Sequence, residues 1–283
     1  MEKVTTVNVY PGIGDILWVF HRLQGLFPIL DINISGKGVR RSLDFVNMIE
    51  GVRNVSYKDI SRPEIKSKTV HDVDLREYEG KDFFLEANTW LESGKRIEDW
   101  MPKTDNFVKE VKFKPMPTHP FVNTLQKRNN ETYIGIYTSN IKNNKVNGMT
   151  PDLWAKYIAE ISSGYENPKI FIIGAEYDKD MGIKIKHLLS LKYKVHAMIT
   201  IGYKIHETMG LLKKLDFIVG FPSGICILSN MFKIPNVMFM TTKLKKMHLT
   251  WVDKDLINND KCFHVQFSDH KNLVNYANKL NLN

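Results

Sequence analysis

The sequence contains little cysteine. Among its 283 residues there are only Cys226 and Cys262, which stand in unrelated contexts. Two isolated cysteines exclude a disulfide framework and a cysteine-based zinc site. We therefore expect two free thiols in a reducing compartment.

The sequence also lacks a long apolar run. A membrane-spanning helix needs about 18 or more consecutive apolar residues. The longest candidate, residues 217–232, is interrupted by Gly220, Pro222, Gly224 and Asn230. The first residues do not combine a basic stretch with an apolar one, as a signal peptide does. We expect no membrane span and a soluble protein of the cytoplasm.

Several catalytic motifs are missing. The sequence has no phosphate-binding Gly-x-x-x-x-Gly-Lys-Ser/Thr loop, no Gly-x-Ser-x-Gly elbow and no His-Glu-x-x-His metal motif. Gly12-Ile13-Gly14 lacks the third glycine of a dinucleotide-binding fingerprint. We expect neither a metal nor a bound cofactor.

Acidic residues are fewer than basic ones. The 40 lysines and arginines exceed the 31 acids by a net charge of +9. Such an excess favours polyanionic partners, which include nucleic acid, an anionic membrane surface and phosphorylated substrates.

What the sequence does contain is an alternation of strand and helix patterns. Residues 4–10 form a β-branched segment typical of a buried strand, and apolar residues at helical spacing follow Asp15. Between them, Gly12 and Gly14 allow a sharp turn in which the backbone approaches a ligand closely. Asp15 then lies at or near the helix N-cap, where it either only caps the helix or acts chemically.

The alternation restarts after a polar, proline-containing stretch at residues 114–131. Alternating strands and helices predict parallel sheets. We expect an α/β protein with two Rossmann-like domains, residues 1–118 and 131–268, facing each other across a cleft. A C-terminal helix over residues 269–283 closes the chain. Residues 61–80 are polar and poorly periodic, and we expect a loop there.

Turns after the second-half strands suit a phosphate ligand. Ser223-Gly224 follows a buried strand and precedes an apolar helix, so free N–H groups, a hydroxyl and a helix N-terminus meet there. A plain structural turn is the alternative. Ser139-Asn140 makes a similar case, with Lys145 within reach of that loop. Gly174 and Glu176 follow another strand, where Glu176 either accepts hydrogen bonds from a ribose or caps a helix.

A segment with two tryptophans is a candidate acceptor-binding surface. Aromatic faces stack on sugars or bases while charged groups orient them. The residues concerned are Trp90, Lys95, Arg96 and Trp100. The alternative is that both indoles fill the core and the charges are solvated.

The order and spacing of these motifs resemble the family 9 glycosyltransferases, the heptosyltransferase-like enzymes with two facing Rossmann-like domains known as the GT-B fold. The segments that carry the resemblance are Gly12–Leu17, Ser139-Asn140 with Lys145 and Pro151–Trp154, Phe171–Glu176, and Asp216–Gly220 with Ser223-Gly224. Each segment is short, but together they cover most of the chain.

The resemblance implies an inverting transfer of a sugar from a nucleotide-diphosphate sugar, without a metal. Asp15 matches the general base of the family, next to Gly14. Ser223 and Gly224 match the turn that binds the donor diphosphate. The family usually has an Asp-Thr-Gly turn followed by a histidine, where this sequence has Pro222, Ser223, Gly224 and Ile227. Donor identity is therefore open.

Two acceptors fit this sequence. The positive charge and the Lys- and Asn-rich composition favour a compact phage-type enzyme, active in the host cytoplasm, that glycosylates a hydroxylated pyrimidine in DNA. Lys95, Arg96, Lys243, Lys245 and Lys246 would then bind phosphates, and Trp90 or Trp100 would stack on an extruded base. The alternative acceptor is a surface glycan or lipopolysaccharide. A third hypothesis, from another class, is a non-catalytic module that binds a nucleotide or sugar.

Overall fold

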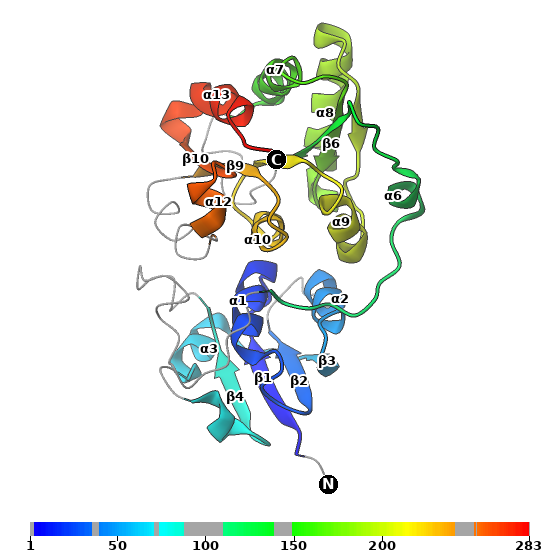
Figure 1. The fold of residues 1–283 in the computed structure, drawn as a ribbon. Helices are drawn as coiled ribbons and strands as arrows, with labels where there is room; N and C mark the ends of the chain where they lie inside the picture. Colours follow the sequence, from blue (N-terminus) through cyan, green and yellow to red (C-terminus); the bar gives the residue numbers. More distant parts are fainter. Residues whose placement is uncertain are drawn as a thin grey trace. The chain divides into compact units, whose positions relative to one another are not determined.

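The structure is a computed structural model that describes residues 3–35, 40–70, 74–87, 110–138, 149–240, 252 and 254–282. The chain divides into two compact units, with a boundary between Pro117 and Thr118. Each unit contains its own parallel sheet (Figure 1). The α/β class expected from the sequence is confirmed.

The first unit has a four-stranded sheet in the order β3-β2-β1-β4. All its strand pairs are parallel. The strands are β1 (Thr5–Val9), β2 (Leu30–Ile34), β3 (Val52–Tyr57) and β4 (Asp82–Leu85). The helices are α1 (Ile13–Leu23), α2 (Arg40–Asn47), α3 (Arg62–Lys68) and the 3₁₀ helix η1 (Leu75–Tyr78).

Helix α1 is buried on most of its surface. Apolar side chains such as Ile16, Leu17 and Phe20 are fully buried. This burial holds the glycine turn that precedes α1 against the sheet, because burying apolar surface is the main stabilising term in folding.

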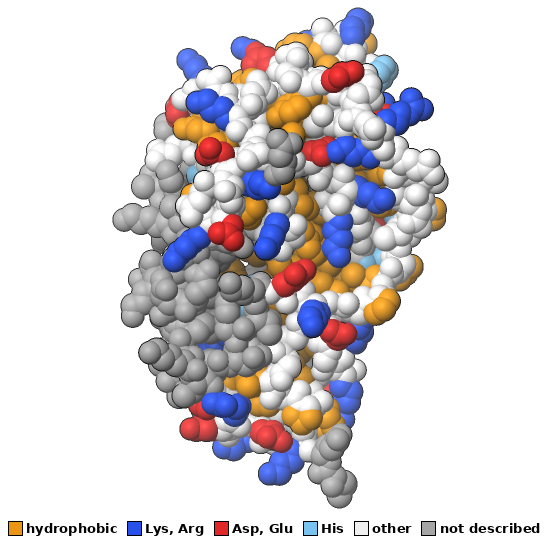
Figure 2. All heavy atoms as spheres, viewed as in Figure 1, with side chains coloured by type: hydrophobic (Ala, Val, Ile, Leu, Met, Phe, Trp, Pro, Cys, Tyr) orange, Lys and Arg blue, Asp and Glu red, His pale blue; other side chains and the backbone are white. Residues whose placement is uncertain are grey.

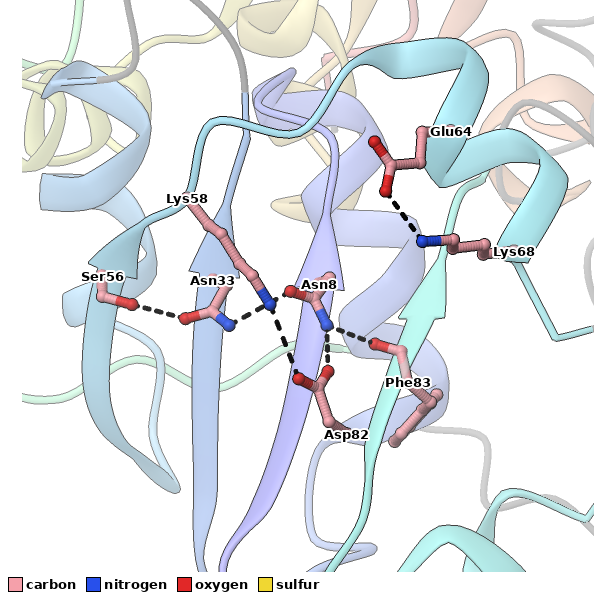
Figure 3. A network of polar contacts seen from close by, with 8 residues as sticks. All are labelled: Asn8, Asn33, Ser56, Lys58, Glu64, Lys68, Asp82 and Phe83. Carbon is pink, nitrogen blue, oxygen red and sulfur yellow. Dashed lines mark hydrogen bonds and ion pairs between the residues drawn. The ribbon is translucent and has the colours of Figure 1, made fainter.

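A row of polar side chains crosses the first sheet (Figure 3). Asn8 on β1 is fully buried, and its side-chain amide donates to the Phe83 carbonyl at 2.9 Å and to Asp82. Asn33 on β2 donates to Asn8 at 3.1 Å and accepts from Ser56 on β3. The network fixes the strand register, because a slip by one residue would leave the buried Asn8 amide without partners.

The prediction of a loop over residues 61–80 is wrong. The segment forms α3 and η1. Ser61 caps α3 by accepting a hydrogen bond from the Glu64 N–H at 3.3 Å, and proline lies in the first turn of the helix. These capping signals are local, whereas the helix is too short to show an apolar period.

The second unit has a six-stranded sheet in the order β10-β9-β8-β5-β6-β7. Its pairs are also all parallel. The strands are β5 (Thr132–Tyr137), β6 (Pro168–Ile173), β7 (Ala197–Ile199), β8 (Phe217–Gly220), β9 (Asn236–Met240) and β10 (Cys262–Gln266). Strand β10 was not expected from the sequence.

The α-helices of this unit are α6 (Pro120–Thr124), α7 (Pro151–Ser162), α8 (Lys179–Leu188), α9 (Ile205–Leu212), α10 (Gly224–Met231), α12 (Lys254–Asn258) and α13 (Leu273–Asn278). Short turns of other helix types are η2 (Glu176–Asp178), η3 (Leu189–Tyr193) and η4 (Phe267–Asn272). One core layer packs Trp154 and Ile158 of α7 against strand residues that include Ile172 and Phe239. None of the helices in the described ranges meets the length and apolarity needed to cross a bilayer.

Candidate functional site

The order of strands in the second unit identifies where a ligand should bind. From β5 the chain first builds outward on one side through β6 and β7, and then on the other side through β8, β9 and β10. In an open parallel sheet, ligands bind at the carboxyl ends of the strands where the order reverses. Here that point lies between β5 and β8. The Phe221 N–H donates to the Tyr137 carbonyl at 3.3 Å, so the two strand ends lie side by side.

Two hydroxyl groups are unsatisfied at this point. Thr138, directly after β5, is fully buried, and its hydroxyl has no hydrogen-bond partner among the described residues. The Ser223 hydroxyl, in the turn after β8, is also buried and equally without a partner in that part of the chain. Buried polar atoms are nearly always paired, so two buried hydroxyls without a protein partner at one sheet edge, within the described residues, mark a candidate ligand site.

The turn at Ser223 presents the N-terminus of α10. Ser223 occupies the N-cap position with extended backbone angles, φ −158° and ψ 178°, but its side chain does not cap the helix. Gly220 permits the close approach of β8 and β5, because a Cβ there would lie 2.4 Å from the Tyr137 carbonyl oxygen. The arrangement leaves a hydroxyl, a helix N-terminus and a side-chain-free Gly224 together, which suits an anion.

The Tyr137 phenol and the Cys226 thiol lie close enough to Ser223 for it to lower the pKa of both groups, although neither forms a hydrogen bond of ordinary distance and angle with the Ser223 hydroxyl. Burial raises the pKa of Tyr137 well above its usual value. Burial likewise raises the pKa of Cys226 to about 12. Both groups are therefore neutral at physiological pH and add no negative charge that would repel an anion.

The turn after β6 contains two acids, of which Asp178 is buried and Glu176 is exposed. Asp178 is buried, and its carboxylate accepts from the Ala175 N–H at 2.8 Å. Glu176 is exposed and pairs with Lys179 at 3.1 Å. Of the two, only Glu176 is placed to meet a ligand, whereas Asp178 shapes the turn at Gly174.

In the first unit, the turn between β1 and α1 places Asp15 in the first turn of the helix. The half-buried Asp15 carboxylate folds back over Gly12, since a Cβ at Gly12 would lie 2.0 Å from Asp15 Oδ2. The Ser42 hydroxyl donates to the Pro11 carbonyl and anchors the turn to α2. A carboxylate here benefits from the positive end of the α1 dipole.

A buried acid that the sequence did not single out lies at the neighbouring strand end. The strand order of the first sheet reverses between β1 and β4. Glu86 directly follows β4, and its fully buried side chain pairs with Arg62 at 3.0 Å. The Arg62 guanidinium also stacks 4.3 Å from the centre of the Tyr10 ring. The sequence signal that could have identified Glu86 is its position as a glutamate at the carboxyl end of an apolar strand.

Several predicted site residues lie outside the described residues. They are Ser139, Asn140 and Lys145 for the donor, and Trp90, Lys95, Arg96 and Trp100 for the acceptor. The same holds for Lys243, Lys245 and Lys246. The other predicted residues are placed at two sheet edges, with Gly14 and Asp15 in the first unit and Gly174, Glu176, Ser223 and Gly224 in the second. Within the described ranges, no three His, Cys, Asp or Glu side chains form a group that could hold a metal ion.

Comparison by sequence finds no relative. No protein-family model matches the chain, and no curated protein matches it.

Comparison by structure does find similar proteins. A glycosyl transferase of family 9 from Veillonella parvula superimposes with a TM-score of 0.62 at 10% identity, covering 99% of this chain and 91% of that chain. The ADP-heptose lipopolysaccharide heptosyltransferase II of E. coli gives a TM-score of 0.56 at 12% identity, over 84% and 85% of the two chains. A provisionally assigned UDP-N-acetylglucosamine 2-epimerase from Listeria monocytogenes gives 0.51 at 10% identity, over 98% and 90%.

These similarities confirm the fold class expected from the sequence. The chain has the two-unit α/β fold of the GT-B glycosyltransferases, which at this level of identity is shared by proteins of more than one activity.

Proposed function

We propose that this protein is a glycosyltransferase that takes a sugar from a nucleotide-diphosphate donor. The observation that carries the proposal is the pair of unsatisfied hydroxyls of Thr138 and Ser223, beside the N-terminus of α10 and at the reversal point of the second sheet. The similarity in fold to a family 9 glycosyltransferase and to a heptosyltransferase supports the same reading.

The second unit is proposed to bind the donor. A diphosphate gains from free backbone N–H groups, from hydroxyl donors and from the positive end of a helix dipole. Thr138, Ser223 and Gly224 offer this set. Glu176 is exposed at the next strand end and is proposed to accept hydrogen bonds from the ribose. These donors would stabilise the diphosphate as it leaves, without a metal ion.

Asp15 is proposed as the general base. Its carboxylate would take the proton of the acceptor hydroxyl while the hydroxyl oxygen bonds to the anomeric carbon. The bond between that carbon and the diphosphate oxygen breaks, and its electron pair leaves with the diphosphate. Attack from the opposite face inverts the anomeric configuration. Such base catalysis typically contributes a factor of about 10² to 10⁴ in rate.

For the acceptor we favour a glycan. The heptosyltransferase of similar fold is described as acting on lipopolysaccharide. The alternative, a hydroxylated pyrimidine in DNA, depends on the net charge of +9 and on residues outside the described ranges. On the face drawn in Figure 2, the basic side chains of the described residues are interspersed with acidic ones and do not form one continuous patch.

Nucleotide binding tests the donor site directly. ADP, GDP and UDP are titrated by calorimetry into the wild type and into Ser223→Ala and Gly224→Val. We expect at least one nucleotide to bind and both variants to weaken it about tenfold or more, since hydrogen bonds to a charged group contribute about 1.5–3 kcal/mol. Ser229→Ala is the matched control, because Ser229 lies on the same helix and its hydroxyl already donates to Ile225 at 2.9 Å. Equal affinity in all four proteins would contradict the proposal.

The product distinguishes the activities that share this fold. A transferase releases the nucleotide diphosphate and adds the sugar mass to an acceptor, whereas an epimerase changes the configuration of a sugar while the nucleotide stays attached or leaves without transfer. A non-catalytic module binds the nucleotide and turns over no nucleotide sugar.

A further inference from the structure

The first unit contains a guanidinium with two nitrogen atoms that have no hydrogen-bond acceptor among the described residues. Arg41 lies in the first turn of α2, and its side chain is partly exposed. Its Nε and Nη2 atoms are buried and have no hydrogen-bond partner in the described parts of the chain. A buried cationic edge without an acceptor is costly, and a ligand that supplies the acceptor removes that cost.

Other arginines of this chain use the same two nitrogens, Nε and Nη2, to bind carboxylates. Arg53 donates through Nε at 2.9 Å and through Nη2 at 2.6 Å to the two oxygens of Asp31. Arg76 binds Asp74 through the same two nitrogens, at 2.8 and 2.5 Å. The Nε–Nη2 pair is a planar fork that matches two oxygens of a carboxylate or a phosphate. Arg41 presents the same fork with no acceptor in the part of the chain that the structure describes.

A second unsatisfied donor lies at the same edge of the sheet. Ser35 follows β2 and is fully buried, and its hydroxyl has no partner within the described ranges. Its N–H donates to the Val9 carbonyl at 3.1 Å, which places Ser35 beside the end of β1. Ser42, next to Arg41, is bonded to Pro11 in the turn that carries Asp15. Both unsatisfied groups therefore belong to the segments that flank that turn.

We infer that Arg41 and Ser35 bind a carboxylate or a terminal phosphate of the acceptor. That the anion belongs to the acceptor rests on the proposed function, because Asp15 is its proposed base, whereas the binding of an anion does not. A terminal carboxylate or phosphate presents two oxygens at its free end, which match the fork of Arg41, while a phosphodiester carries chain on both sides. The geometry therefore favours a charged sugar over the backbone of a nucleic acid.

Three monosaccharides test this inference. Glucuronate, glucose 6-phosphate and uncharged glucose are titrated into the wild type, Arg41→Gln, Arg41→Lys and Ser35→Ala, with binding followed by calorimetry. We expect one or both charged sugars, but not glucose, to bind the wild type. Arg41→Gln should lose affinity at least tenfold, and Arg41→Lys should recover only part of it because an ammonium lacks the planar fork. Whichever charged sugar binds with the higher affinity identifies the preferred anion as a carboxylate or a phosphate.

Two controls keep the result specific. Arg53→Gln removes a guanidinium that is already paired with Asp31 and should leave sugar binding unchanged. Gly224→Val changes the α10 turn of the other unit and should also leave it unchanged, which shows that the sugar is not bound there. Ser35→Ala removes a hydroxyl with no partner among the described residues, so the variant should fold normally and still bind the sugar several-fold more weakly.

Unchanged affinity in both Arg41→Gln and Ser35→Ala would overturn the inference. Failure of the wild type to bind either charged sugar would do the same, as would Arg41-dependent binding of a short DNA duplex alone. None of these readouts uses a nucleotide sugar, so they are independent of whether sugar transfer occurs.

Discussion

At the scale of single residues, unsatisfied polar atoms are the most informative feature of this protein. Leaving a buried hydroxyl without a partner costs about 1–3 kcal/mol. Thr138, Ser223 and Ser35 each bear such a hydroxyl within the described ranges, and all three follow directly after or close to the carboxyl end of a strand. Binding sites often lower the stability of the free protein in this way, because their polar groups are arranged to pair with a ligand.

Replacing Thr138 by valine should separate stability from binding. Valine keeps the shape of threonine and removes the unpaired hydroxyl, so we expect the free energy of unfolding to rise by about 1 kcal/mol while nucleotide affinity falls. Urea denaturation and calorimetry measure the two effects. The control is Thr200→Val, whose hydroxyl donates to Ile172 at 3.2 Å and whose loss should lower stability by about 0.5–1.5 kcal/mol. A destabilised Thr138→Val with normal affinity would count against this assignment.

Gly12→Ala should displace the Asp15 carboxylate and so lower the rate of transfer, although Asp15 itself is still present. The new methyl group would lie 2.0 Å from Asp15 Oδ2, so the carboxylate must move. We expect kcat to fall about tenfold or more, since small misplacements of a catalytic group are costly. A double-mutant cycle with Asp15→Asn provides the control, because Gly12→Ala should then have little further effect. Additive losses would mean that Gly12 acts through something other than Asp15.

At the scale of elements, Trp154 of α7 packs against Phe221 in the turn that follows β8. Its ring packs edge-on against Phe221 at 5.8 Å and against Phe239 at 5.6 Å between centroids. Trp154→Ala should lower the free energy of unfolding by about 3–5 kcal/mol, as is typical of large aromatic residues in a core. Chemical denaturation checks this. A loss below about 1 kcal/mol would show that the site repacks freely.

Tyr165 links the loop after α7 to α13. Its hydroxyl donates to the Ala277 carbonyl at 2.7 Å. Burial raises its pKa from 10.0 to about 12. The folded state therefore holds this proton more tightly than the unfolded chain, so the resulting stability is complete below pH 10 and is lost as the pH rises toward 12.

The matching variant is Tyr165→Phe. At pH 7 it should be less stable by about 0.5–1.5 kcal/mol because the hydrogen bond is lost. The difference from the wild type should shrink as the pH rises through 10 to 12, as followed by urea denaturation at several pH values. A constant difference across that range would contradict the assignment of the shifted proton to Tyr165.

Apolar elements were predictable from the sequence, and elements that carry polar residues were not. Strands β5 and β9 are apolar runs between turn residues, which is the sequence pattern that predicts a buried strand. Helix α3 and strand β10 are short and carry polar residues, so tertiary packing rather than periodicity decides them. The candidate site shows the same division. Turn glycines and Asp15 stand out in the sequence, whereas the unsatisfied states of Thr138, Ser35 and Arg41 depend on contacts that only the fold defines.

At the scale of the whole molecule, each of the two parallel sheets has candidate functional residues at the point where its strand order reverses. The first contributes the carboxylates of Asp15 and Glu86, and the second contributes the turn at Ser223, which is proposed to bind the donor diphosphate. The fold similarity to glycosyltransferases was expected from four short motifs even though overall identity to the solved structures is only 10–12%. We propose that the Asp15 carboxylate of the first unit acts on the acceptor and that the partially positive N-terminus of α10 in the second unit binds the donor.

The measurement that tests this account most directly is sugar transfer by the wild type and by Asp15→Asn. Both proteins are incubated with a panel of ADP-, GDP- and UDP-sugars and with candidate acceptors, and nucleotide release and acceptor mass are followed by mass spectrometry. The account predicts transfer from one donor by the wild type. It also predicts that Asp15→Asn binds that donor equally well but transfers about 10² to 10⁴ times more slowly. Transfer at the wild-type rate by Asp15→Asn, or no turnover of any nucleotide sugar by the wild type, would contradict it.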